Sequence, residues 1–310
     1  YFTLAANQNH EDSIYLLSLI YKRKEFNAYD INKSTYYLEL AAKHNNPTAA
    51  YEIGSIYMDN NSALYNINKA IHYLKIASDH NNIQAQFNLG IIYFNQKYFS
   101  YDINKSIYYF TLASNNGDSI SQFFIGFLYY DGQYVPRDIN KSIHYLTLAA
   151  NQNLSYAQSL LGVIYYNNKY IPRNINKSIH YLTLASDQNY DYAQCFLGRK
   201  YIKGKHIPKN IAKGIHLLTL SANKNNSLAQ CLLGKIYIEG KIVPKDVTKS
   251  IYYLRLASNQ NESDAQLLLG TIYLEDKFIS RDVDKSIYYL KLSSDVMAQF
   301  LLGLIYYDGL

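Results

Sequence analysis

The sequence predicts an all-α fold, an α/α solenoid of 36-residue helix–turn–helix repeats. Two columns of residues support this prediction. The first recurs every 36 residues and comprises Ile31, Ile67, Ile103, Ile139, Ile175, Ile211, Val247 and Val283. The second keeps the same period and comprises Gly54, Gly90, Gly126, Gly162, Gly198, Gly234 and Gly270, with Gly303 arriving three residues early and Ser18 in the first place. A period of this size is typical of a stack of short supersecondary units.

The first helix of each repeat, the A helix, is predicted from its apolar spacing. In residues 156–167 apolar residues recur at i, i+3, i+4, i+7 and i+8, which marks one buried helix face. These residues are Ala157, Leu160, Leu161, Ile164 and Tyr165. The glycine column lies inside this helix, where glycine costs roughly 1 kcal/mol relative to alanine. Its recurrence indicates that a neighbouring helix backbone approaches closely there.

A loop with a glycine column follows, and then the second helix, the B helix, predicted over 175–186 in one repeat. It begins after a column of short acceptors that can cap free backbone amides. These are Asp30, Asn66, Asp102, Asp138, Asn174, Asn210, Asp246 and Asp282. It ends at residues that tolerate a left-handed backbone. These are Asn9, Asn45, Asn81, Gly117, Asn153, Asn189, Asn225 and Asn261. The pattern gives nine A helices, eight complete B helices and a B-helix remnant at 1–6.

Composition excludes several classes of protein. Of 310 residues, 48% are apolar and 17% charged, which is incompatible with disorder driven by charge excess. The net charge of +6, 30 basic minus 24 acidic residues, is spread thinly, whereas a nucleic-acid binder concentrates its basic residues. The longest clean apolar run, 123–130, is far shorter than the roughly 20 residues of a spanning helix. We expect no nucleic acid and no direct membrane insertion for this segment.

The chain starts at Tyr1 inside one repeat and ends at Leu310 inside another. We therefore expect a single array over 1–310, about nine repeats truncated at both ends, within a longer protein. Cys195 and Cys231 occupy equivalent positions one repeat apart, so their Cα atoms are expected beyond the roughly 7 Å limit for a disulfide. We expect two free thiols and find no signal or transmembrane segment in this fragment. Both observations favour a cytoplasmic location.

The recurring pattern "AQxxLGxIYxxGxxVPxDxxKSIxYLxLAS" resembles the Sel1-like repeat, a relative of the tetratricopeptide repeat. The resemblance covers essentially all of 1–310, although Asn replaces the family's usual Gly after the B helix. It implies antiparallel helix pairs stacked into a right-handed superhelix. It also implies a non-catalytic scaffold or adaptor that binds other proteins and needs no cofactor.

By analogy with tetratricopeptide stacks, the A helices form the concave wall that holds a peptide or partner helix. The residue after the A-helix glycine and the residue four after it would face inward. The second of these columns would form an apolar strip: Met58, Phe94, Tyr130, Tyr166, Ile202, Ile238 and Leu274. The partner-binding candidates are Ile91, Phe127, Tyr130, Val163, Tyr166, Arg199, Lys200, Lys203, Lys235 and Thr271.

One repeat departs from its siblings. Residues 199–213 carry six basic side chains and no acidic one: Arg199, Lys200, Lys203, Lys205, Lys209 and Lys213. Two interpretations remain open, drift in a redundant repeat and a dock for an acidic peptide or phosphopeptide. A lysine in the first turn of every B helix, such as Lys141, is open to two interpretations as well. Its stem covers the neighbouring repeat, or the column is a basic ladder for an acidic ligand.

No residue set predicts catalysis or a metal site. His72, His144, His180 and His216 share one column, but helices in such stacks lie roughly 8–10 Å apart, too far for ligands at about 2.1 Å from one metal. They are predicted to form an exposed amphipathic row. Ser221 and Lys224 match Ser-x-x-Lys without companion motifs, so we interpret the match as coincidence. The alternative to a scaffold is a regulatory or docking arm of an enzyme, for example kinase-like, whose catalytic domain lies outside this segment.

Overall fold

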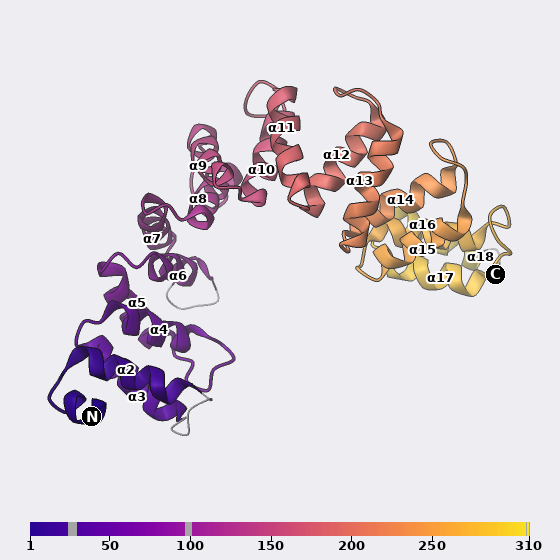
Figure 1. The fold of residues 1–310 in the computed structure, drawn as a ribbon. Coiled ribbons are helices and arrows are strands. Elements are labelled where there is room, and N and C mark those ends of the chain that lie inside the picture. Colours follow the sequence, from indigo (N-terminus) through magenta and orange to yellow (C-terminus); the bar gives the residue numbers. More distant parts are fainter. Residues whose placement is uncertain (24–29, 97–100, 308, 310) are drawn as a thin grey trace. The chain divides into compact units, whose positions relative to one another are not determined.

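The computed structural model describes residues 1–23, 30–96, 101–307 and 309. Within these ranges the chain forms eighteen α-helices and no strand, which confirms the all-α helical-repeat fold (Figure 1). The A helices carry even numbers: α2 (Glu11–Lys22), α4 (Pro47–Met58), α6 (Ile83–Phe94), α8 (Ser119–Asp131), α10 (Ser155–Tyr166), α12 (Asp191–Lys203), α14 (Ser227–Glu239), α16 (Ser263–Leu274) and α18 (Val296–Tyr307). The B helices carry odd numbers: α1 (Phe2–Ala6), the remnant, then α3 (Ile31–Lys43), α5 (Ile67–Asp79), α7 (Ile103–Asn115), α9 (Ile139–Asn151), α11 (Ile175–Asp187), α13 (Ile211–Asn223), α15 (Val247–Ser258) and α17 (Val283–Leu292).

The chain divides into two compact units, unit 1 over residues 1–152 and unit 2 over 153–310. In each unit a helix contacts chiefly the next helix along the chain, which is typical of repeat arrays. That one array runs through both units stays a prediction. None of the described helices is long and apolar enough to cross a membrane.

The predicted helix boundaries are confirmed. In all eight complete B helices the Asp or Asn before the first residue accepts a hydrogen bond from the backbone N–H three residues on, at 2.9–3.1 Å. After the B helices the predicted asparagines have φ between 59° and 67°, and Gly117 has φ 90°. The B helices therefore begin and end at the capping residues that the sequence predicts.

The glycine column marks close contact between the two helices of a hairpin, as predicted. A Cβ built on Gly126 would lie 2.7 Å from Cγ of Leu146, and one on Gly162 would lie 2.5 Å from Cγ of Leu182. Both leucines are at most 1% exposed. The missing Cβ thus makes room for a buried leucine of the following B helix, and this packing offsets the helix-propensity cost of glycine.

A serine of the B helix adds a hydrogen bond to this contact. The Oγ of Ser106 donates to the carbonyl of Gly90, 2.8 Å away, and the Oγ of Ser178 donates to the carbonyl of Gly162, 2.7 Å away. Ser34, Ser250 and Ser286 make the same bond to Ser18, Gly234 and Gly270. Gly214 takes the serine position in α13, and a Cβ there would lie 2.9 Å from the Gly198 carbonyl, so these two backbones meet directly.

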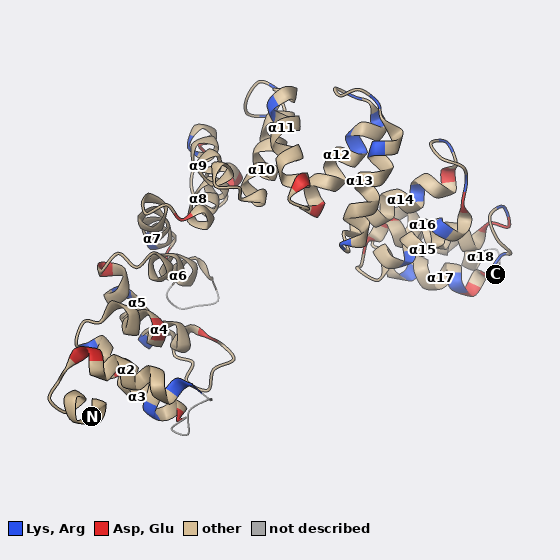
Figure 2. Ribbon diagram, viewed as in Figure 1, with Lys and Arg blue, Asp and Glu red and all other residues tan. Residues whose placement is uncertain are grey.

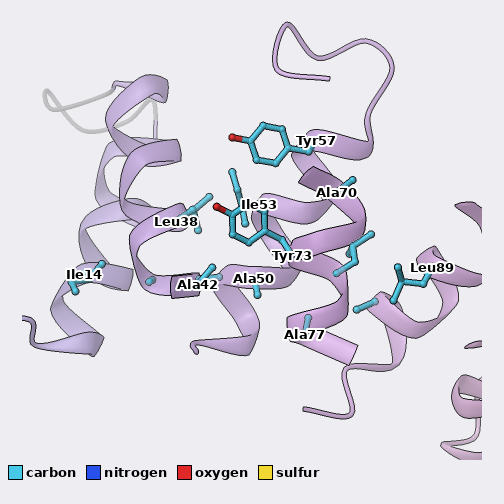
Figure 3. Close-up of a cluster of buried hydrophobic side chains, with 14 of the residues drawn as sticks. Ile14, Leu38, Ala42, Ala50, Ile53, Tyr57, Ala70, Tyr73, Ala77 and Leu89 are labelled. Carbon is cyan, nitrogen blue, oxygen red and sulfur yellow. The ribbon is translucent and has the colours of Figure 1, made fainter. Parts of the chain in front are cut away.

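Buried apolar side chains follow the helices as a strip. Figure 3 shows part of this core in unit 1, where side chains of successive hairpins point toward one another. The labelled residues are Ile14, Leu38, Ala42, Ala50, Ile53, Tyr57, Ala70, Tyr73, Ala77 and Leu89. Phe110 is the largest fully buried side chain among the described residues, and its ring stacks on Phe124 at 5.2 Å between centroids.

The lysine of each B helix covers a tyrosine of the A helix that precedes it. In all eight complete B helices the Nζ lies 4.7–5.4 Å from the centroid of that ring. Six of these tyrosines also stack on a B-helix tyrosine, as Tyr165 does on Tyr181 at 6.0 Å. Where the cap is Asp the ammonium also approaches its carboxylate, at 3.2 Å for Lys249 and Asp246. Each ammonium therefore lies over a ring of its own hairpin and not over the neighbouring repeat, although Nζ of Lys69 also lies 3.2 Å from Glu39 of the preceding hairpin. This use favours scaffolding over a basic ladder.

Candidate functional site

The A-helix face of unit 2 is hollowed along α12, α14 and α16. The main hollow, of about 260 Å³, lies between α12 and α14 and is lined by Arg199, Ile202, Lys203, Leu218, Leu232, Lys235, Ile236, Glu239 and Ile242. A second, of about 240 Å³, is lined by Leu228, Cys231, Leu232, Lys235, Asp264, Leu267 and Leu268. A third, of about 30 Å³, is lined by Tyr192, Cys195, Phe196, Arg199 and Leu228. Arg199 and Lys235 each border two hollows, so the three adjoin one another.

The structure brings together three of the ten predicted partner-binding residues. Arg199, Lys203 and Lys235 lie at the main hollow, around a floor of apolar side chains. The pattern of charges is plain in Figure 2, where the stretch from the end of α12 into α13 carries blue segments and no red ones. In α12 and α14 the residue after the A-helix glycine is cationic, and both of these side chains, Arg199 and Lys235, border the main hollow.

The other candidates do not join this cluster. Ile91, Phe127 and Tyr130 belong to unit 1, where Phe127 is 37% exposed and stacks on Phe123. Val163 and Thr271 are half-buried on α10 and α16 and border none of the three hollows. Their role in binding stays a prediction.

The predicted apolar strip is interrupted in unit 2. Ile202 and Ile238 are only 8% and 7% exposed, and both belong to the core between the helices. The prediction of an open strip is wrong at these two positions, because their side chains point into the hairpin stack. Ile202 contributes instead to the floor of the main hollow.

Lys200 and Tyr166 form a separate cluster beside the hollows. The Nζ of Lys200 lies 3.8 Å from the centroid of the Tyr166 ring and 4.8 Å from that of Phe196. Both residues are predicted partner-binding candidates, and Lys200 also departs from its column in the sequence. In the eight sibling A helices the column of Lys200 holds Ile or Leu: Ile20, Ile56, Ile92, Leu128, Ile164, Ile236, Ile272 and Ile305. Lysine alone breaks this apolar column.

The other side chains that could act as nucleophiles, bases or metal ligands have structural roles or are isolated from one another. The Oγ of Ser221 donates to the backbone carbonyl of Asp191, and Nζ of Lys224 donates to that of Asn189, so the two do not form a nucleophile–base pair. Burial raises the pKa of Cys195 to about 11 and that of Cys231 to about 12, which keeps both free thiols protonated and poor nucleophiles. The four column histidines are exposed, as predicted. Over the described part of the chain no three His, Cys, Asp or Glu side chains gather as a metal site.

A buried glutamine in each of the six A helices from α6 to α16 lies between consecutive B helices and can bond to both. In unit 2, Nε2 of Gln230 donates to the carbonyl of Ala222 at the end of α13, and its Oε1 accepts from Nε2 of Gln260 after α15, 2.8 Å away. Gln194 donates in the same way to Ser186, but Lys224 stands where the second donor is expected. Gln194 is 1% exposed, and its Oε1 accepts no hydrogen bond from any described residue.

We expect Lys224→Gln to stabilise unit 2 by about 1 kcal/mol, because it supplies a donor to a buried acceptor that lacks one. The reverse change in a sibling repeat is the matched control. Gln188 donates to Gln158 at 2.7 Å, so Gln188→Lys is expected to cost a similar amount. Urea unfolding of the two variants checks both values. Equal stability of Lys224→Gln and wild type would contradict the role given to the glutamine.

The repeat and its geometry have clear relatives. The Sel1 repeat model matches nine consecutive segments: 27–46, 47–82, 83–118, 119–154, 155–190, 191–226, 227–262, 263–295 and 296–310. A Sel1 repeat protein from Oxalobacter formigenes is 25% identical with a TM-score of 0.83, covering 98% of this chain and 89% of that one. A protective antigen of uropathogenic Escherichia coli with an SLR fold is 24% identical with a TM-score of 0.83, covering 99% and 67%. No protein of curated function matches the chain. The glycine column, the caps and these matches together show that the chain belongs to the Sel1 repeat family.

Proposed function

We propose that the chain is a non-catalytic adaptor that binds a peptide or partner helix on the A-helix face of unit 2. Sel1 repeat proteins are generally protein-interaction scaffolds. The observation that carries the proposal is the main hollow between α12 and α14, where an apolar floor meets a cationic rim.

The size of the main hollow favours a side chain over a cofactor. Its volume of about 260 Å³ lies at the lower edge of the roughly 300–1,000 Å³ typical of small-molecule sites. Leu232 is shared with the second hollow, so the apolar lining continues toward α16. A peptide or helix that crosses α12, α14 and α16 could place successive apolar anchors in these depressions.

The rim favours an acidic partner. Arg199, Lys203 and Lys235 border the main hollow, and the single carboxylate there, that of Glu239, is 3.6 Å from Nζ of Lys241. Charges at the edge of an apolar site contribute to orientation and association rate more than to raw affinity. We therefore expect binding to weaken as salt rises.

The test needs a purified partner. Once affinity purification has identified it, calorimetry with the intact chain measures the dissociation constant for wild type and for Arg199→Glu/Lys235→Glu. We expect the double variant to bind at least about 10-fold more weakly, since both changes reverse charge at the rim. Lys43→Glu/Lys75→Glu, at exposed positions on B helices of unit 1, is the control of equal charge change.

Unchanged affinity of the rim variant, with both proteins folded by circular dichroism, would refute the proposed face. Phe127→Glu tests separately whether the A-helix face of unit 1 takes part. A loss confined to Phe127→Glu would move the binding face from unit 2 to unit 1.

A further inference from the structure

Lys200 occupies a position that the rest of the chain reserves for buried apolar side chains. Five of its eight siblings are at most 3% exposed: Ile92, Leu128, Ile164, Ile272 and Ile305. A charged group in such a column is costly unless something offsets it. Lys200 instead carries its ammonium 3.8 Å above the Tyr166 ring, at the half-exposed surface of α12. The stability of the fold therefore does not explain why a lysine stands at this position.

Two further basic side chains meet at the same ring. Cζ of Arg173 lies 5.5 Å from the centroid of Tyr166, and the ring of His206 lies 6.0 Å from it. Nη1 of Arg173 is 2.9 Å from Nε2 of His206. A guanidinium has no acceptor, so Arg173 donates and His206 is neutral with its proton on Nδ1.

Backbone contacts hold these groups in place. Nε of Arg173 donates to the carbonyl of Tyr166, 2.8 Å away. His206 adopts φ 73°, a left-handed conformation that is uncommon for residues other than Gly, Asn and Asp. The corresponding loop residues Tyr134 and Tyr170 have no such φ. The histidine is thus fixed against Arg173 at some conformational cost.

The cluster carries uncompensated positive charge. No described Asp or Glu lies within ion-pair distance of Arg173, Lys200, Lys205 or His206. Partial desolvation, and then the charges of Arg173, Lys205 and Lys200, hold the pKa of His206 below its ordinary value. By contrast, five of the eight first-turn lysines of the B helices pair with the carboxylate of their own cap.

We propose that Arg173, Lys200 and His206 form a binding site for a phosphomonoester carried by a partner peptide. A phosphate group bears nearly two negative charges and three acceptor oxygens, which matches a guanidinium, an ammonium and an imidazole converging on one ring. A single carboxylate would leave part of this charge unmatched. Binding a dianion also favours protonation of His206 at Nε2, which ends the bond from Arg173 and leaves both the guanidinium and Nε2–H free to donate to the phosphate.

The neighbouring surface points to a peptide as the carrier. Phe196, which contacts Lys200, also lines the 30 Å³ hollow, and Arg199 connects that hollow to the main one. A peptide on the A-helix face could therefore place a phosphorylated side chain at Tyr166 and apolar anchors along α12 and α14. This part of the inference rests on the proposed function, whereas the phosphate site itself does not.

Phenyl phosphate tests the site without a known partner. We expect it to shift the His206 ring resonances of the intact chain in NMR, identified by their absence in His206→Gln, and to raise the pKa of His206. Lys200→Ile restores the apolar residue of the siblings and is expected to fold well while binding phenyl phosphate about 10-fold more weakly. Lys224→Gln removes the same charge elsewhere in unit 2 and should leave binding unchanged.

Equal binding of phenyl phosphate by wild type and Lys200→Ile would overturn the proposal, as would no binding at all. Response to single-stranded oligothymidylate or to anionic vesicles, without response to phenyl phosphate, would assign the cluster to another ligand class and also overturn it. A positive titration together with an unaffected rim variant would uphold the site while refuting the A-helix face as the peptide groove.

Discussion

Gly162→Ala is expected to destabilise unit 2 by about 2 kcal/mol, although alanine is the better helix former. Its Cβ would lie 2.5 Å from Cγ of Leu182, 3.0 Å from Cδ2 and 3.2 Å from the backbone nitrogen of the same residue. Leu182 is 1% exposed and its Cγ cannot swing aside, so α10 and α11 must separate. Urea unfolding, with hydrogen exchange of α10 and α11 to localise the loss, measures the effect.

Gly303→Ala provides the control in the same column. A Cβ at Gly303 meets no described atom within 4 Å, so only helix propensity operates there. We expect this change to stabilise α18 by up to about 1 kcal/mol. If both substitutions stabilised the protein, the close approach of the helices would not be the reason for the glycine column.

Phe110→Ala is expected to have the largest effect of any single truncation in unit 1, a loss of about 3–5 kcal/mol. The side chain is 0% exposed and lies between Phe87, at 5.9 Å between centroids, and Phe124. Its removal leaves a cavity that Gly90, directly opposite, cannot fill, because a glycine has no side chain to move into it. Calorimetric or denaturant unfolding gives the value.

Phe110→Leu separates volume from ring stacking. Leu74 and Leu146 fill the same position in neighbouring hairpins, so leucine fits the backbone geometry. We expect a cost below about 1.5 kcal/mol. A leucine variant as unstable as the alanine variant would show that stacking with Phe124, rather than filled space, is the main contribution.

The features predicted well from the sequence are those fixed by local chemistry. A cap such as Asp138 is determined by its own short side chain and the amide three residues on, and the left-handed Asn189 by its own backbone. The glycine column was interpretable because its propensity cost demands a compensating contact. Because the repeats are periodic, an inference made at one position applies to the equivalent positions of the other repeats.

Contacts across helices were harder to foresee. The bond from Ser178 to Gly162 joins residues 16 apart, and nothing in either residue type specifies the partner. The sequence does not decide the use of the first-turn lysine for the same reason, since that use depends on where the preceding tyrosine ring lies. Lys200 could have been found by comparing columns, yet the presence of Arg173 and His206 beside it depends on loop geometry.

Gln194 bonds to the end of α11 but lacks the donor that Lys224 replaces after α13, and this has a mechanical consequence. When a stack of hairpins is stretched, load passes through each joint in series and the weakest one gives way first. Within unit 2 we expect rupture to begin between α11 and α13, where Oε1 of Gln194 lacks its donor. This joint includes α12, which carries Arg199 and Lys203 of the main hollow, so tension on a tethered copy would distort the hollow before the remaining hairpins unfold.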